Sequence, residues 1–147
     1  MHVGMLSEQR AHALPRREIL RGKSTISPLF NEGNRLKGGP LLMFYTCSRQ
    51  GDRTGCTPVR VLFTVGKKLV PRAVDRNRIK RLMREAYRLE KKALSGLTVS
   101  EADGVPCQVL LAFLYRGRAD SVPPLAEFRT EIRRMLNTMV TKRLAQL

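Results

Sequence analysis

The stretch "AVDRNRIKRLMREAYRLEKK", residues 73–92, has the spacing of an amphipathic helix. At about 100° per residue, its apolar side chains fall on one arc and most of its cations fall on the opposite side. The apolar arc consists of Ile79, Leu82, Met83, Ala86 and Tyr87. With Asp75 as its expected N-cap, this helix should pack one face on a sheet and leave the other face strongly positive.

Positive charge in this part of the chain exceeds what folding requires. Residues 67–92 contain eleven Lys and Arg against three acids, a net of eight, which is half of the chain's net charge of +16. A solvated helix face normally mixes both signs, and like charges three or four residues apart destabilise an isolated helix. The imbalance therefore favours binding to a phosphate-bearing polyanion over a plain solvated face.

The segments around this helix alternate between strand and helix patterns. Apolar runs at 40–47, 58–65 and 105–115 predict buried strands. Amphipathic patterns at 24–32 and from about residue 121 to the C-terminal end predict two further helices. The resulting order is helix, strand, strand, basic helix, strand, helix, which predicts an α+β fold in which helices cover a small sheet.

Length and composition indicate one domain in an aqueous compartment. The 147 residues suffice for a single core, which we expect at 19–147, after a flexible basic tail at 1–18. No apolar run approaches the roughly 20 residues that a membrane span needs, and the N-terminal stretch lacks the apolar region of a secretory signal. We therefore expect a cytoplasmic protein that does not bind membranes.

The side chains that usually carry catalysis or hold metals are sparse. The three cysteines form no CxxC pair, and both histidines lie in the first twelve residues. There is no nucleophile and base motif, no paired carboxylates at a recognisable spacing and no phosphate-binding GxxxxGK[ST] loop. The sequence therefore predicts no catalytic residue and no metal ligand in this chain.

The segment "RNRIKRLMREAYR" (76–88) closely resembles the signature helix of the protein subunit of bacterial ribonuclease P. Flanking segments resemble the same family in the same order, over residues 19 to about 145. They are "ILRGKSTISPLFNEG" (19–33), "LLMFYT" (41–46), "RVLFTVGKK" (60–68) and "CQVLLAFLY" (107–115).

This resemblance implies a small two-layer α-β sandwich, with a mixed sheet of about four strands and helices packed on it. It also implies a left-handed β-α-β crossover through the basic helix, although right-handed crossovers are the general rule. The implied function is that of a protein cofactor for a ribozyme. The RNA subunit, with Mg²⁺, would cleave the 5′ leader from precursor tRNA, while the protein binds both RNAs and needs no obligate protein partner.

The resemblance also implies two sets of RNA-binding residues. The residues expected to bind the catalytic RNA are Arg76, Asn77, Arg78, Lys80, Arg81, Arg84 and Arg88. The residues expected to bind the leader of precursor tRNA are Phe30, Tyr45, Thr64, Lys67 and Lys68. Aromatic rings with lysines suit a single-stranded leader, because stacking tolerates any base and lysine binds phosphate.

The chain departs from the family pattern at two places. Ile26 stands where relatives often carry a second aromatic residue, and "LVPRAVD" (69–75) replaces a small Gly-Asn-Ala turn. Two other functions are compatible with the residues alone. One is a general or ribosome-associated RNA-binding protein, and the other is a DNA-binding domain that uses the basic helix in the major groove.

Overall fold

The computed structural model describes residues 14, 16–48, 59–94 and 108–145, which form one mixed sheet of four strands. The strands are β1 (Asn34–Gly38), β2 (Leu41–Ser48), β3 (Val59–Val65) and β4 (Gln108–Tyr115), in the spatial order β1-β2-β4-β3. β2 is antiparallel to β1 and β4, whereas β3 and β4 run parallel. The expected α+β class and mixed sheet are confirmed.

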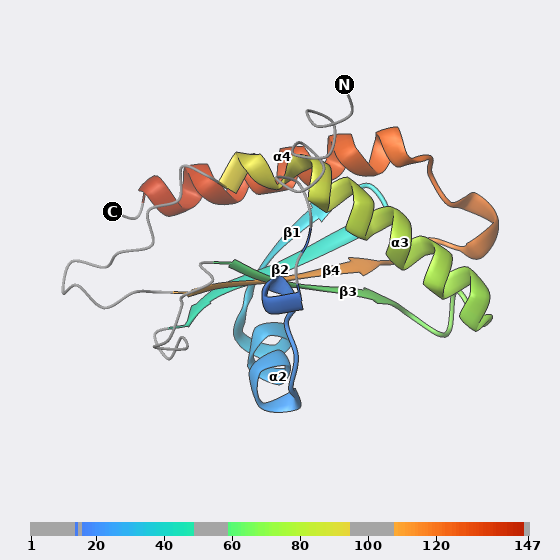
Figure 1. Ribbon diagram of the computed structural model, residues 1–147, viewed down its shortest axis with the longest axis horizontal. Helices are drawn as coiled ribbons and strands as arrows, with labels where there is room; N and C mark the ends of the chain where they lie inside the picture. Colours follow the sequence, from blue (N-terminus) through green and yellow to red (C-terminus); the bar gives the residue numbers. More distant parts are fainter. Residues whose placement is uncertain (1–13, 15, 49–58, 95–107, 146–147) are drawn as a thin grey trace, which may run out of the picture.

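Helices lie on both faces of this sheet. α3 (Ala73–Glu90) and α4 (Leu125–Ala145) cover one face, and the shorter α2 (Lys23–Glu32) lies against the other (Figure 1). Three 3₁₀ turns complete the described elements, namely η1 (Arg16–Glu18), η2 (Lys91–Leu94) and η3 (Ala119–Ser121). α2 thus adds a partial third layer to the two layers expected from the sequence.

Strand alternation explains why the sheet has two apolar faces. On β2, Met43 packs into the larger core beneath α3 and α4, while Leu42 and Phe44 pack beneath α2. The larger core also receives Ile79 and Met83 from α3, both at most 1% exposed. Burying a large apolar side chain contributes about 1.5–3 kcal/mol, so this face holds most of the fold's stability.

β1 is the strand that the sequence pattern did not predict. β1 and β2 form a hairpin whose turn consists of Gly39 and Pro40, and Gly39 has a φ of 57°. That value lies in the left-handed region, which glycine occupies without steric cost. The short edge strand "NRLKG" has only one buried residue, Gly38, so it carries little hydrophobic periodicity.

α3 connects the parallel strands β3 and β4, as a β-α-β crossover must. The hand of this crossover stays a prediction. α3 begins at Ala73, with Arg72 at the N-cap position and no side-chain cap hydrogen bond. Asp75, the expected N-cap, instead lies in the first turn, where its negative charge suits the positive end of the helix dipole.

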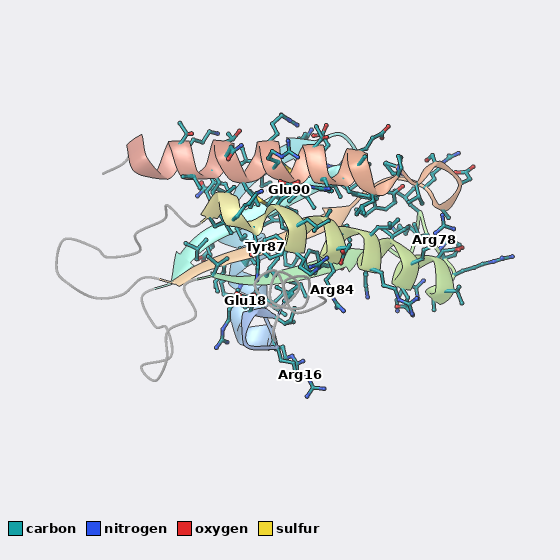
Figure 2. The ribbon with its side chains drawn as sticks, turned by 45° about the horizontal axis from the view of Figure 1, so that its top comes forward. Arg16, Glu18, Arg78, Arg84, Tyr87 and Glu90 are labelled. Carbon is teal, nitrogen blue, oxygen red and sulfur yellow. The ribbon has the colours of Figure 1, made fainter. Side chains whose placement is uncertain are left out.

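A buried carboxylate joins α3 to α4. Glu90, 2% exposed, accepts hydrogen bonds from Arg129 Nε at 2.9 Å and from Arg133 Nε at 2.9 Å. Figure 2 shows Glu90 between the two helices. The hydrogen bond from Arg133 is the main cause that holds the pKa of Glu90 below its usual value, ahead of the bond from Arg129. These contacts set how α3 lies beside α4.

The N-terminal end of the described chain is tied to the sheet and to η2, the turn that follows α3. Ile19 forms a parallel bridge with Val61, and the Leu20 N–H donates to the Val61 oxygen at 2.9 Å. Lys91 Nζ lies 3.2 Å from Glu18 Oε2. Of the tail expected at 1–18, residues 16–18 therefore form η1, whereas 1–13 and 15 lie outside the described residues.

Candidate nucleic-acid interface

The outward side of α3 carries a continuous series of cations. Its inward side is fixed by five buried residues that face the core, namely Ile79, Met83, Ala86, Tyr87 and Glu90. Asn77, Arg81 and Arg84 lie opposite them and are exposed. Arg78 is exposed at the border of this side, and Arg78 and Arg84 project at different levels of the helix (Figure 2). The helix thus presents what was expected, an apolar face inward and a basic face outward.

Lys80 lies at the border of this face, and Arg88 continues the face one turn after Arg84; both are half-buried. Arg88 is bound by Glu85 of the preceding turn, to which its Nε donates at 2.9 Å and its Nη2 also donates. The hydrogen bond from Arg88 is the main cause that lowers the pKa of the Glu85 carboxyl. Because this pair neutralises part of its charge, Arg88 should contribute less to phosphate binding than Arg81 or Arg84.

Arg76 has a structural contact that the sequence did not indicate. It is half-buried, and its Nη1 donates to the backbone oxygens of Val70 at 3.0 Å and Pro71 at 2.7 Å. These carbonyls belong to the connection between β3 and α3. Arg76 therefore holds that connection against the first turns of the helix, and only the rest of its guanidinium is available to a ligand.

The face of the sheet beneath α2 holds a second group of residues. Phe30 of α2 contacts Phe44 of β2 edge to face, and the Arg35 guanidinium carbon lies 5.4 Å from the Phe44 ring centroid. Thr64 lies on this same face of β3, since it alternates with the core residues Phe63 and Val65. Phe30 and Thr64 are thus brought to one face, as the sequence predicts.

Tyr45 is not brought to this face, which corrects the expected grouping. It packs against the larger core beneath α3 and α4, and its register partner on β4 is Leu111 of that core. Consecutive residues of a strand point to opposite faces, so the aromatic of β2 that faces α2 is Phe44. The sequence analysis chose Tyr45, whereas the adjacent ring of the same strand, Phe44, is the one on this face.

Lys67 and Lys68 lie in the turn after β3 and are both exposed. They are close in sequence to the end of β3 that carries Thr64 and to the start of α3. Because they lie in the sequence between Thr64 and the cations of α3, either of the two surfaces can use them.

Arg60 is a further candidate that the sequence analysis missed. It shares the face of Leu62 and Thr64 on β3, and its Nε is a buried nitrogen with no hydrogen-bond partner among the described residues. A buried guanidinium nitrogen without a partner is costly, and an anionic ligand would satisfy it. Period-two alternation along "VRVLFTV" was the signal that could have placed Arg60 on the α2 side. The same alternation along β2 could have placed Phe44 there.

The described residues contain no group of three or more His, Cys, Asp or Glu side chains placed to hold a metal ion. Within the same parts of the chain, no helix has both the length and the apolar content to span a bilayer. The cationic, hydrogen-bonding and aromatic side chains described above are groups that proteins use to bind nucleic acids.

Comparison with known proteins gives matches to one family. Residues 14–109 match the model of the family described as Ribonuclease P. The ribonuclease P protein component of Chlorobaculum tepidum is 62% identical over 146 residues, covering 99% of this chain and 95% of the relative. That of Chlorobium phaeobacteroides is 40% identical over 142 residues, covering 95% of this chain and 96% of the relative.

Two solved structures share the fold. The ribonuclease P protein of Thermotoga maritima superposes with a TM-score of 0.61 at 20% identity, covering 83% of this chain and 97% of that chain. The protein of Staphylococcus aureus gives a TM-score of 0.56 at 15% identity, covering 83% and 94% of the two chains. At these identities the likeness concerns the fold alone.

Proposed function

Because this chain belongs to the ribonuclease P family, we propose that it is the protein cofactor of the ribonuclease P ribozyme. In this proposal it is one subunit of a cytoplasmic endoribonuclease ribonucleoprotein that removes the 5′ leader of precursor tRNA. The catalytic RNA carries out the cleavage, and this chain binds that RNA and the leader. The observation that carries the proposal is the exposed cationic face of α3, opposite the residues that anchor the helix to the core.

The α3 face binds the backbone of the catalytic RNA. Arg81 and Arg84 each offer a planar fork of donors that binds two phosphate oxygens at once. Asn77 can both donate and accept, so it contacts a sugar or a base edge near the start of the helix. Arg78 and Lys80 extend the contact to either side, while Arg76 and Arg88 contribute less because each is partly engaged within the protein.

The leader lies across the face of the sheet beneath α2. There the half-buried Phe30 supplies ring surface for a base, the buried Phe44 packs against its ring, and Arg60 supplies a nitrogen that lacks a partner in the described chain. Thr64 adds a hydroxyl, and Lys67 and Lys68 guide the backbone toward the end of β3. Stacking and phosphate contacts of this kind accept many leader sequences.

The two surfaces are separated by the sheet, so one domain can hold the catalytic RNA and the leader at the same time. α3 and α2 lie on opposite faces (Figure 1). This arrangement brings the leader of precursor tRNA to the ribozyme and leaves mature tRNA, which has no leader, without that contact. The chain's role is to bind and orient, and it takes no part in bond cleavage.

Mg²⁺ enters this proposal through the RNA. It is bound by phosphates of the catalytic RNA and supplies charge stabilisation to the cleavage step. Cations on α3 reduce the repulsion among RNA phosphates, so less Mg²⁺ is needed to hold the RNA in its active fold.

Reconstitution of cleavage tests this function. The purified chain, the cognate catalytic RNA and a precursor tRNA are combined at low millimolar Mg²⁺, with each component omitted in turn. We expect no cleavage by the chain alone, slow cleavage by the RNA alone and fast cleavage by the two together. Cleavage by the chain without RNA would contradict the proposal. Equal binding to unrelated structured RNAs without faster cleavage would indicate a general RNA-binding protein instead.

A further inference from the structure

Two large apolar side chains are well exposed in the described part of the chain, one in the connection that leads from β3 into α3 and the other in the first turn of α3. Leu69 is 45% exposed and Val74 is 78% exposed. A single exposed apolar residue is ordinary on a protein surface. Here the two stand five residues apart among the exposed cations of the same segment, which are Lys67, Lys68, Arg72 and Arg78.

The connection and the start of α3, which carry these two side chains, are firmly held. Val70, which separates Leu69 from Pro71, is fully buried, and its N–H donates to the Gly66 oxygen at 3.2 Å. Arg76 binds the carbonyl oxygens of Val70 and Pro71. Val74 itself lies in the first turn of α3. Both apolar side chains are therefore exposed on an anchored frame. The connection from β3 and the start of α3 lie at one end of the molecule (Figure 1).

The charge around these two apolar side chains decides which kind of partner can cover them. The exposed cations of the segment face only one nearby acid in the sequence, Asp75. A second copy of this chain, with a net charge of +16, would bring like charge against it. A polyanion that also offers flat apolar surface fits both features, and an RNA with an unpaired base or an open helix end is such a partner.

We propose that Leu69 and Val74 form an apolar tip that packs against an exposed base face of the catalytic RNA, while Arg72 and Arg78 bind the phosphates beside it. This inference rests on the proposed function and adds a contact of a different kind to it. The arginines of the α3 face bind by charge, so their contacts do not depend on which bases are present. The tip needs an unstacked base, so it selects a particular structural element of the RNA.

The two kinds of contact respond differently to salt. Loss of a phosphate contact lowers the slope of log affinity against log salt, because fewer counterions are released. Loss of an apolar contact to a base weakens binding at every salt concentration and leaves that slope unchanged. This difference separates the tip from its charged surroundings.

The test uses the full-length chain with Val74→Thr, which keeps the size and the β-branch and removes an apolar methyl group. Affinity for the cognate catalytic RNA is measured over a series of salt concentrations. We expect binding about three- to tenfold weaker, with an unchanged salt slope. Val122→Thr, the same change at a half-buried valine before α4, is the matched control and should bind as the wild-type chain does.

Leu69→Ser is the second variant, and its expected result is the same. Chemical probing of the RNA should show one element that the wild-type chain protects and that both variants leave reactive. Wild-type affinity in both variants would overturn the inference, as would an altered salt slope or a change in the oligomeric state of the free chain. Cleavage assays with the wild-type chain run in parallel. If the wild-type chain stimulates cleavage while both variants bind the RNA normally, the inferred contact is wrong and the proposed function stands. If the wild-type chain does not stimulate cleavage, the proposed function itself fails.

Discussion

Phe30 of α2 meets Phe44 of β2 edge to face, with ring centroids 4.7 Å apart and an interplanar angle of 64°. The pair lies on the face of the sheet opposite Tyr45, which packs toward the core under α3 and α4. Two adjacent aromatic residues of one strand thus point to different faces, and only Phe44 lies on the α2 side, where it packs against Phe30.

Replacing Phe30 by Ala should selectively weaken binding of precursor tRNA. Loss of one base-stacking ring costs roughly 1–3 kcal/mol, so the affinity for a leader-bearing substrate should fall about fivefold or more. The affinity for mature tRNA should change little. The ratio of the two dissociation constants, measured with the reconstituted holoenzyme, reports the effect.

Tyr45→Ala is the matched control for that experiment. Because Tyr45 lies on the other face, it should leave the ratio between precursor and mature tRNA unchanged, whatever its effect on stability. A selective loss with Tyr45→Ala and none with Phe30→Ala would reverse the assignment of the two faces.

Arg76→Ala should destabilise the protein as well as weaken RNA binding. It removes two hydrogen bonds from a cationic side chain to the carbonyls of Val70 and Pro71, so the free energy of unfolding should fall by about 1–2 kcal/mol. Arg81→Ala, on the exposed side of α3, should stay within about 0.5 kcal/mol of the wild-type value. Urea unfolding of the free chain measures both, and equal stabilities would show that the Arg76 contacts do not hold the connection.

Glu90→Gln should loosen the junction of α3 and α4. It leaves Arg129 and Arg133 facing a neutral amide in place of a buried carboxylate. We expect the free energy of unfolding to fall by about 2–3 kcal/mol. This is less than for a fully buried pair, because both arginines are partly exposed. Glu131→Gln, which breaks the exposed contact with Arg134, should cost less than about 1 kcal/mol. Thermal unfolding of the two variants side by side decides whether burial makes the difference.

Low pH should destabilise the protein through the same carboxylate, that of Glu90. The pKa of Glu90 is lowered in the folded chain, so the unfolded chain takes up its proton first as the pH falls. The stability that Glu90 contributes is therefore complete above its unfolded pKa of about 4.3 and is lost as the pH falls through the lower folded value. The melting temperature of wild-type protein should fall more steeply below pH 4.3 than that of Glu90→Gln, and parallel curves would contradict this.

The parts of the fold with strong hydrophobic periodicity could be predicted from the sequence. The arc of Ile79, Met83 and Tyr87 placed α3 within two residues of its observed end, and the apolar runs placed β2, β3 and β4. β1 could not be predicted, because its stability comes from pairing with β2 through a glycine turn and from little burial of its own.

The candidate site was predictable as a set of residue types and less so as a geometry. The exposed positions of Arg81 and Arg84 follow directly from the helical period. The engagement of Arg76 with two loop carbonyls depends on where the chain enters the helix, and the side of Tyr45 depends on strand register. Glu90 stood on the apolar arc at helical spacing, but its partners lie about forty residues further along, on α4.

The central claim is that the outer face of α3 binds the catalytic RNA through its phosphates, and the salt dependence of Arg81→Ala tests it most directly. Affinity of the full-length chain for the cognate RNA is measured over a range of salt concentrations, with Arg134→Ala on α4 as the control. We predict weaker binding and a slope of log affinity against log salt that is smaller by about one unit for Arg81→Ala, with no change for Arg134→Ala. An unchanged slope for Arg81→Ala would contradict the account, since it would mean that this face of α3 meets only water.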